Sequence, residues 1–305
     1  MTQSIHYTNC PFCGSDRISE CLTAIDYTVS KQEFSIWECT RCKGRFTQNI
    51  PGANDIGAYY QSDAYISHTN AEQGLINRLY HRVRRVTLQS KKKLIISQTS
   101  RDTGDLLDIG AGVGTFAHFM KASGWNVTGL EPDETTIQRA RNIYGIELQH
   151  TSNLFSLPER SFDAITLWHV LEHVHDLNGY VERFKSLIKP GGLIFIAVPN
   201  YTSYDAGYYK EYWAAYDVPR HLYHFSPGSM EKLLIKHGFT VRSIRPMWFD
   251  SFYVSMLSQQ YKTGKEGIFS GAWIGFVSNL RTIFNKRRGS SLLYVVELNK
   301  LKVKS

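Results

Sequence analysis

The chain has 305 residues, of which 42% are hydrophobic and 20% charged, and its formal net charge is +8. This length allows one large domain or two smaller ones, and the hydrophobic content suits a packed core. The first nine residues are polar and lack the apolar stretch of a secretory signal, so we do not expect export. The positive charge is compatible with a nucleotide-linked substrate, RNA or an acidic membrane surface, and it selects none of them.

Four of the five cysteines form two Cys-x-x-Cys pairs, Cys10 with Cys13 and Cys39 with Cys42. In a cytosolic chain this pattern indicates metal ligation rather than disulfides. Four thiolates would close a tetrahedral shell around one zinc ion, so we predict a structural zinc in a ribbon module over residues 1–55. Metal binding would also supply folding free energy that so short a module hardly gains from its core.

Residues 56–103 are predicted to be a helical connector between this ribbon and the next domain. Its apolar residues recur at helical spacing, and its other faces are basic, with Ile76, Leu79, Val83 and Val86 against Arg78, Arg82, Arg84, Arg85 and Lys91, Lys92, Lys93. Such a helix could hold RNA, phosphates or lipid head groups. We interpret it instead as the solvated side of a helix packed on the following domain.

From residue 104 to residue 305, strand and helix patterns alternate, which predicts an α/β fold with a parallel sheet covered on both faces. Strands are expected over residues 106–109, 125–130, 162–168, 193–198, 239–244 and 292–297. The helix after the second strand is expected to bury Ile137, Ala140 and Ile143.

The first of these strands runs into three alternate glycines, Gly110, Gly112 and Gly114, with Asp108 just ahead of them. Glycines there permit backbone angles closed to other residues and let the main chain approach a ligand. Glu131 ends the next strand, where it is placed to accept hydrogen bonds from ribose hydroxyls. The dinucleotide fingerprint needs its third glycine one position later, so this spacing points away from a pyrophosphate ligand.

Together with Asp108, this loop resembles motif I of the class I S-adenosylmethionine-dependent methyltransferases. The match extends to residues 157–163, 168–174 and 189–192. The resemblance implies a Rossmann-like sheet, mostly parallel and with its last strand antiparallel, and S-adenosylmethionine as the cofactor.

The resemblance also implies individual cofactor contacts. The loop from Gly110 to Gly114 would face the methionine part, Glu131 the ribose, and Asn153 with Leu154 the adenine, and Pro132 is a further predicted cofactor contact. Many relatives place an aspartate near residue 153, and here the amide oxygen of Asn153 would replace it. Trp168 and His169 complete the predicted cofactor contacts.

Methyl transfer from a sulfonium needs in-line alignment and, for an alcohol or carbon acid, a base. Residues 200–225, rich in aromatics, are predicted to form a substrate lid inserted after the fifth strand. This segment resembles zinc-ribbon methyltransferases of polysaccharide and cell-envelope pathways, and more distantly sugar C-methyltransferases. The resemblance places His221 on their histidine base, with His224 as second choice and Arg220 where the sugar enzymes have glutamate.

Both histidines have an alternative interpretation, as hydrogen-bonded side chains that pack the lid. A cation at Arg220 would lower the basicity of the neighbouring imidazole while helping to bind a phosphate or carboxylate. His169, Glu172 and His173 form a second polar cluster, and ubiquinone-pathway O-methyltransferases use acidic residues near this place for a divalent metal. We interpret this cluster as helix capping and contact with the methionine end of the cofactor.

Residues 265–288 carry an apolar stripe at helical spacing, followed by Lys286, Arg287 and Arg288. The stripe is too short and too interrupted to span a bilayer, which takes roughly twenty apolar residues. It could lie in a membrane interface, or it could pack on the sheet or on a second subunit.

These features predict a cytoplasmic, membrane-peripheral methyltransferase that acts on a sugar or glycan precursor, on oxygen or carbon. An RNA methyltransferase is the competing enzyme, because some rRNA enzymes also join a zinc ribbon to this fold. A non-enzymatic zinc-ribbon binding protein with a degenerate methyltransferase fold is the third hypothesis, and the intact Asp108, glycines and Glu131 argue against it.

Overall fold

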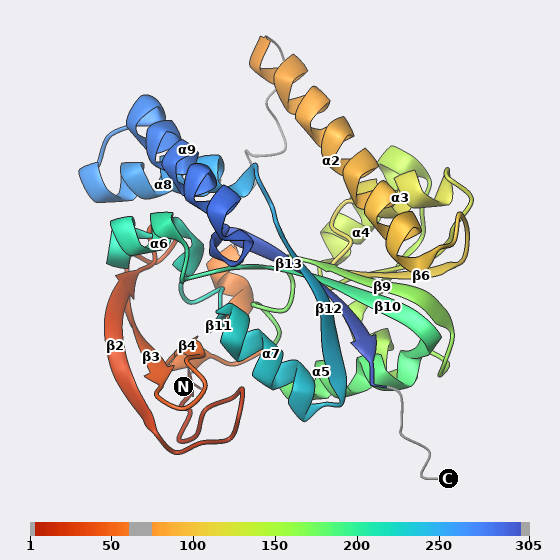
Figure 1. Cartoon of the computed structure of the whole chain (residues 1–305), viewed down its shortest axis with the longest axis horizontal. Helices are drawn as coiled ribbons and strands as arrows, with labels where there is room; N and C mark the ends of the chain where they lie inside the picture. Colours follow the sequence, from red (N-terminus) through yellow and green to blue (C-terminus); the bar gives the residue numbers. More distant parts are fainter. Residues whose placement is uncertain (1–3, 61–74, 300–305) are drawn as a thin grey trace. The chain divides into compact units, whose positions relative to one another are not determined.

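The computed structural model describes residues 4–60 and 75–299, without the side chains of residues 75–83 (Figure 1). Tyr65 and the side chains of Ile76, Arg78, Leu79, Arg82 and Val83, which the sequence patterns used, lie outside the described residues. The chain divides into two compact units. The first unit comprises Met1–Tyr65, His169–Tyr180 and Ala197–Tyr294, and the second comprises Ile66–Trp168, Val181–Ile196 and Val295–Ser305. The domain boundaries expected after residues 55 and 103 follow the sequence alone and stay a prediction.

A seven-stranded sheet forms the framework predicted for the α/β fold. Its strand order is β12 (Phe239–Pro246), β13 (Ser291–Leu298), β10 (Ile188–Pro199), β9 (Phe162–Trp168), β6 (Asp105–Ile109), β7 (Asn126–Glu131) and β8 (Leu148–His150). Strand β6 pairs in parallel with β7 and β9, and β7 pairs in parallel with β8. The last strand of the chain is antiparallel, which confirms the predicted Rossmann-like arrangement.

The helices beside this sheet follow the apolar spacing only in part. They are α2 (Leu75–Thr99), α3 (Thr115–Lys121), α4 (Glu134–Tyr144) and α5 (Leu177–Leu187). Ala140 is buried as expected, but Ile143 is 59% exposed, and that expectation is wrong. Tyr144 points inward instead, where its ring stacks on His118. Val86 is likewise exposed, and Ile95 is the buried residue of the described part of α2.

The ribbon strands lie in the first unit as a four-stranded antiparallel sheet. Its order is β11 (Tyr223–His224), β4 (Arg45–Thr47), β3 (Glu33–Cys39) and β2 (Ile18–Ile25), and β1 (Ser4–Ile5) pairs separately with β5 (Ile50–Pro51). Strand β3 alternates in the way expected of a half-buried strand, since Phe34 and Ile36 are buried. Strand β11 comes from the predicted lid, so the ribbon sheet is completed by a segment about 180 residues later in the chain.

The lid segment shares a hydrophobic core with the ribbon. Tyr209, Trp213 and Tyr216 are buried in one cluster with Phe34 and Ile36. These aromatics lie on α6 (Tyr204–Tyr209) and on the short 3-10 turns that follow it, η3 (Lys210–Tyr212) and η4 (Ala214–Tyr216). Most of the aromatic stretch is therefore core of the first unit.

Three longer helices complete the first unit. Helix α7 (Pro227–Lys236) begins with Ser226 as its N-cap, in a capping box with Ser229, as the Ser-Pro sequence predicted. Helices α8 (Asp250–Thr263) and α9 (Ile268–Phe284) form a hairpin (Figure 1). Short 3-10 turns also occur at η1 (Ile56–Tyr60), η2 (Thr151–Ser156) and η5 (Lys286–Arg288). Among the described helices, none combines the length and the apolar character that crossing a bilayer requires.

Candidate active site and metal centre

The glycine loop between β6 and α3 has the backbone that its sequence predicted. Gly110, Gly112 and Gly114 have φ values of 69°, 55° and 74°, which side-chain-bearing residues seldom adopt. Gly114 is also the N-cap residue of α3, and a Cβ there would lie 2.8 Å from Cγ2 of Ile146. The loop therefore depends on glycine for both conformation and space.

Glu131 is held against this loop by main-chain hydrogen bonds. Its Oε2 accepts from the Gly112 N–H at 2.9 Å, and its Oε1 accepts from the Asp133 N–H at 3.3 Å. Burial raises the pKa of Glu131, and these hydrogen bonds oppose that rise. Each carboxylate oxygen keeps further acceptor capacity, as a ligand hydroxyl requires.

Asp108 lies beneath the loop with no exposed surface of note. Thr166 donates a hydrogen bond to its Oδ1 at 2.7 Å, and burial raises the pKa of Asp108 to about 6. In the described part of the chain, its Oδ2 is buried without a hydrogen-bond partner. A ligand with N–H donors, such as the ammonium group of a bound methionine moiety, would satisfy this acceptor.

Four other predicted cofactor residues lie at differing depths in the second unit. Trp168 is half-buried, and its ring lies 3.9 Å from Nζ of Lys91 and edge-on to Phe116. Leu154 is fully buried, whereas Asn153 and Pro132 are exposed. Lys91, one of the basic connector residues, thus packs against Trp168. This contact agrees with the interpretation of the connector as a helix packed on the following domain.

His169 directly follows β9 and lies between two carboxylates. Its Nδ1 is 3.3 Å from Glu172 Oε1, and its Nε2 is 3.1 Å from Asp250 Oδ2. Burial works to lower the pKa of His169, but the two carboxylates outweigh it and raise the pKa to about 10. The ring is therefore an imidazolium at neutral pH, and its φ of 58° marks an uncommon backbone for a non-glycine residue.

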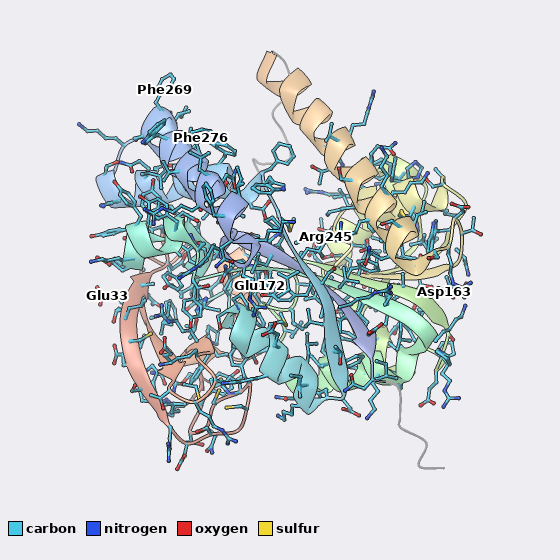
Figure 2. All side chains as sticks on the ribbon, viewed as in Figure 1. Glu33, Asp163, Glu172, Arg245, Phe269 and Phe276 are labelled. Carbon is cyan, nitrogen blue, oxygen red and sulfur yellow. The ribbon has the colours of Figure 1, made fainter. Side chains whose placement is uncertain are left out.

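Glu172, His173 and His221 form a compact polar cluster in the first unit (Glu172 is labelled in Figure 2). Their ligand atoms lie within 4.8 Å of one another, and Glu172 is fully buried, so this group could hold a metal ion. The His173 ring meets the His221 ring edge-on at 4.6 Å. Burial and the nearby His221 lower the pKa of His173 to about 4, so His173 is neutral at pH 7.

His221 is oriented by the backbone of the lid. Its Nδ1 lies 2.8 Å from the carbonyl oxygen of Ala215, and a carbonyl only accepts, so Nδ1 carries the proton. In the neutral ring, Nε2 then has the lone pair that a base needs. Asp217 Oδ2 is 3.9 Å from Nε2, close enough to stabilise the imidazolium formed when Nε2 takes a proton.

Arg220 and His224, which the sequence placed near the acceptor, both serve contacts inside the first unit. The Arg220 guanidinium is 2% exposed and donates to Asp26, to Asp217 and to the carbonyl oxygen of Tyr59. His224 Nε2 lies 3.1 Å from Thr47 Oγ1, and burial lowers its pKa well below the usual value. His221 therefore keeps the arrangement expected of a base, whereas His224 packs against the ribbon.

The four predicted zinc ligands converge in the ribbon. Their sulfurs lie within 4.8 Å of one another, with Cys10 Sγ 3.5 Å from Cys42 Sγ and Cys13 Sγ 3.7 Å from Cys39 Sγ. Tetrahedral zinc with bonds of about 2.3 Å to sulfur requires sulfur separations of about 3.8 Å. The cluster could therefore hold such an ion. Cys21 lies apart from it in β2, where its thiol donates to the carbonyl oxygen of Ile36.

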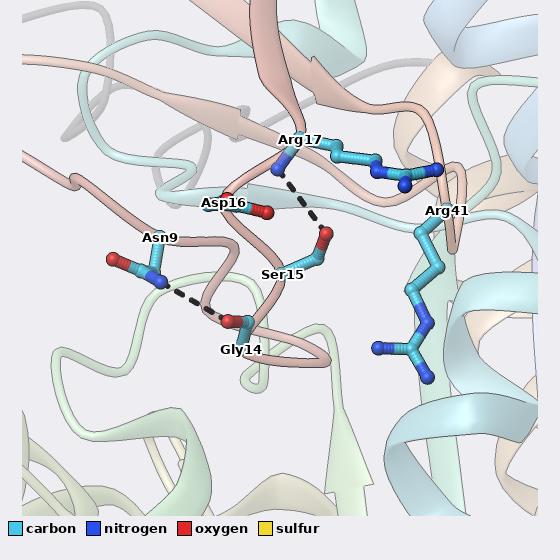
Figure 3. Close-up of a pocket in the computed structure, with 6 residues that line it drawn as sticks. All are labelled: Asn9, Gly14, Ser15, Asp16, Arg17 and Arg41. Atoms are coloured by element: carbon cyan, nitrogen blue, oxygen red, sulfur yellow. Dashed lines mark hydrogen bonds between the residues drawn. The ribbon is translucent and has the colours of Figure 1, made fainter.

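A polar hollow of about 580 Å³ lies beside the first cysteine knuckle (Figure 3). It is lined by Asn9, Gly14, Ser15, Asp16, Arg17 and Arg41. Two guanidinium groups and one carboxylate therefore share this surface, which could accept a phosphate against Arg17 and Arg41.

Several functional contacts have no local signal in the sequence. Asp26, Asp217 and Asp250 contact the histidine and arginine cluster, yet no motif marks Asp26 or Asp250, and Asp217 was given no role although it lies in the predicted lid. Asp217 was nearest to detection, since it lies four residues before His221 and a carboxylate beside a candidate base is a common arrangement.

Known proteins that this chain is similar to are methyltransferases. A family model described as "Methyltransferase domain" matches residues 79–244, more than half of the chain. Over 103 residues the chain is 35% identical to a ubiquinone biosynthesis O-methyltransferase of Methylocella silvestris. The aligned region covers 32% of this chain and 40% of the relative. Over 163 residues it is 28% identical to the human mitochondrial ubiquinone biosynthesis O-methyltransferase, covering 48% of this chain and 44% of the relative.

The chain thus spans about half or less of the length of these relatives. Among solved structures, a SAM-dependent methyltransferase from Archaeoglobus fulgidus aligns with a TM-score of 0.48 at 19% identity, covering 73% of this chain and 99% of that one.

Proposed function

The chain belongs to the S-adenosylmethionine-dependent methyltransferases, and from that premise we propose that it methylates a sugar or glycan precursor, with His221 as general base. Its family makes it an enzyme, which sets aside the hypothesis of a binding protein with a degenerate fold. S-adenosylmethionine supplies an activated methyl group on a good leaving group. The protein's own task is to align the acceptor and to remove its proton.

The observation that carries the choice of base is the tautomer of His221. With Nδ1–H donated to Ala215, only Nε2 can accept a proton. Asp217 Oδ2 lies 3.9 Å from this same nitrogen, near the positive charge that forms, while the Ala215 carbonyl oxygen orients the ring through the opposite nitrogen. His173 is too weak a base at neutral pH, and His224 is engaged with Thr47.

We favour an acceptor hydroxyl over an acceptor carbon. The two ubiquinone biosynthesis enzymes named above are O-methyltransferases, and a base such as His221 serves a hydroxyl acceptor. A nucleotide-linked or lipid-linked sugar agrees with the positive net charge, and we expect the reaction to take place in the cytoplasm.

For the cofactor we propose that Glu131 binds the ribose hydroxyls, Asp108 the ammonium group, and residues 110–114 the methionine part through their main chain. Pro132, Asn153, Leu154, Trp168 and His169 remain proposed cofactor contacts. For the ribbon we propose structural zinc on Cys10, Cys13, Cys39 and Cys42, with no part in the chemical step because four thiolates complete its shell.

RNA is the second candidate acceptor, and the hollow with Arg17 and Arg41 favours it. Phosphate contacts of this kind make binding steeply dependent on salt. Methyl transfer to ribosomal RNA, with binding that weakens as salt rises, would replace the sugar proposal.

The test combines calorimetry with transfer of labelled methyl groups to nucleotide sugars, polyprenyl-linked glycans and RNA. His221→Ala should bind S-adenosylmethionine as the parent protein does, while turnover falls by about 10²- to 10⁴-fold, the usual contribution of a general base. Glu131→Ala is the matched control, since it should weaken cofactor binding.

Two outcomes would count against the proposal. Absence of S-adenosylmethionine binding by the zinc-loaded protein would remove the cofactor assignment. Unchanged turnover of His221→Ala on the identified acceptor would mean that another group takes the proton.

A further inference from the structure

Helices α8 and α9 pack against each other through small residues. The buried residues of α9 are Gly271, Gly275, Ser278 and Thr282, together with one large apolar residue, Ile274. A Cβ on Gly271 would lie 2.5 Å from Cα of Met256, and a Cβ on Gly275 would lie 2.7 Å from the carbonyl oxygen of Ser251. The two helix backbones therefore touch, and no large apolar side chain is used to join them at these points.

The opposite face of α9 carries the large apolar side chains and leaves them exposed. These form a stripe at spacings of four and three residues, Phe269, Trp273, Phe276, Leu280 and Ile283, and Phe284 follows the stripe. Phe269 is 92% exposed and Phe284 is 91% exposed. Figure 2 shows Phe269 and Phe276 projecting from α9. A helix on a water-facing surface normally turns its large apolar side chains toward the protein interior. Helix α9 does the opposite, because its small residues face inward and most of its large apolar residues face outward.

The apolar surface continues onto the start of α8. Trp248, Phe249 and Tyr253 are each between 42% and 51% exposed. Isolated exposed apolar residues are ordinary on proteins, but a contiguous set marks a surface that another apolar phase covers.

The charge of the segment decides whether this apolar surface is covered by a second copy of the chain or by a membrane. Residues 248–288 contain six basic residues against two acids, Asp250 and Glu266. The basic residues lie mainly at the two ends of α9, with Lys262 and Lys265 before it and Lys286, Arg287 and Arg288 after it, all exposed. Arg287 forms an ion pair with Glu231, so the other four are the charges at these ends that would face lipid. A second copy of this chain would bring an equally basic surface against this one, whereas anionic phospholipid supplies the opposite charge.

We propose that residues 248–288, the α8–α9 hairpin, dock on an anionic membrane surface, with the apolar stripe of α9 lying in the interface between head groups and acyl chains. The small-residue contact agrees with this environment, because helices in apolar surroundings associate through close backbone approach. Aromatic side chains prefer the interfacial region, and the basic ends contact lipid phosphates. This proposal does not depend on the identity of the methyl acceptor.

Vesicle flotation tests the proposal with the full chain, using phosphatidylcholine vesicles with and without phosphatidylglycerol. The parent protein should float with the anionic vesicles at low salt, and added salt should weaken binding. The triple variant Phe269→Ser, Trp273→Ser, Phe284→Ser should bind at least about tenfold more weakly, because it removes most of the inserted apolar area. The matched control is Ile143→Ser with Ile235→Ser, two residues 59% and 65% exposed outside the hairpin, which should bind as the parent does.

A second measurement does not depend on how the triple variant folds. Brominated acyl chains should quench tryptophan fluorescence of the parent protein on anionic vesicles, and the double variant Trp248→Phe, Trp273→Phe should remove most of the quenching while binding persists. Absence of parent binding at low salt would overturn the proposal, as would full binding of a folded triple variant. A dimer in solution that the triple variant abolishes, with no vesicle binding by the parent, would assign the stripe to a second copy instead.

Discussion

At the scale of single residues, a buried ion pair between Asp26 and Arg220 joins the ribbon and the lid. Asp26 is fully buried, and its oxygens accept from the main-chain N–H groups of Thr28, Val29 and Ser30 and from Arg220 at 3.0 Å. Burial works to raise the pKa of Asp26, but these hydrogen bonds and the Arg220 charge outweigh it and hold the pKa below its usual range.

Asp26→Asn should therefore lower the free energy of unfolding by about 3 kcal/mol at pH 7, the usual cost of breaking a buried pair from one side. Urea denaturation measures this difference. Asp16→Asn, at an exposed position of the same ribbon, is the control and should change stability by less than about 0.5 kcal/mol.

The same pair predicts a pH dependence. Because the folded pKa of Asp26 is depressed, its contribution is complete above the unfolded pKa of about 3.9 and is lost as the pH falls through the folded value. The stability difference between parent and Asp26→Asn should thus be constant from pH 6 to pH 7 and shrink below about pH 4. A difference that grows on acidification would contradict the assignment.

Residues of this kind also mark the limit of prediction from the sequence. Asp108, Glu131 and the glycines could be identified because their pattern is local to one strand, turn and helix. Asp26 and Arg220 are 194 residues apart, and only the fold brings them together. The sequence suggested that Arg220 binds a phosphate or carboxylate of the substrate, and the carboxylates that it contacts are those of Asp26 and Asp217.

At the scale of elements, two glycines flank helices in the left-handed conformation for different reasons. Gly114 begins α3 with φ 74°, and Gly145 ends α4 with φ 62°. A Cβ at Gly145 would meet nothing within 4 Å, whereas one at Gly114 would crowd Ile146 at 2.8 Å and Ala140 at 3.3 Å. Alanine substitutions at these two glycines therefore distinguish two contributions to the loss of stability. Gly145→Ala measures the strain of the left-handed backbone alone, and Gly114→Ala adds the crowding of the new Cβ.

Gly145→Ala should cost about 1 kcal/mol of unfolding free energy, because only the left-handed backbone is strained. Gly114→Ala should cost about 1–3 kcal/mol more, since the side chain also overpacks the core. It should also weaken S-adenosylmethionine binding, and calorimetry on both variants checks this. Equal losses of unfolding free energy in the two variants would show that Ile146 moves aside with no loss of stability.

Elements were predictable where their pattern was long and local. The strand at Phe162–Trp168 was predicted to the residue because five of its seven residues are apolar. Strand β8 was missed because its three residues, Leu148–His150, hold one apolar side chain. The stripe on α9 was recognised as apolar, but periodicity alone does not say whether a stripe faces a core or the outside.

At the scale of the whole molecule, the proposed zinc centre and the lid belong to one cooperative body. Phe12, between Cys10 and Cys13, packs edge-on against Tyr223 and Phe225 of the lid. Strand β11 completes the ribbon sheet, and Thr47 donates to the carbonyl oxygen of His221. The proposed base His221 is therefore held by the ribbon sheet, and in our proposal the folding of this sheet depends on zinc.

Removing zinc with a strong chelator should then disorder the lid as well as the ribbon. Hydrogen exchange should accelerate across residues 204–225 together with residues 10–47, because both lose the shared sheet and core. S-adenosylmethionine binding should persist, since Asp108, the glycines and Glu131 lie in the second unit, while methyl transfer should fall by at least about tenfold and return when zinc is added back. Unchanged exchange in residues 204–225 after metal loss would mean that the lid folds without the ribbon and that its histidine is positioned by the lid alone.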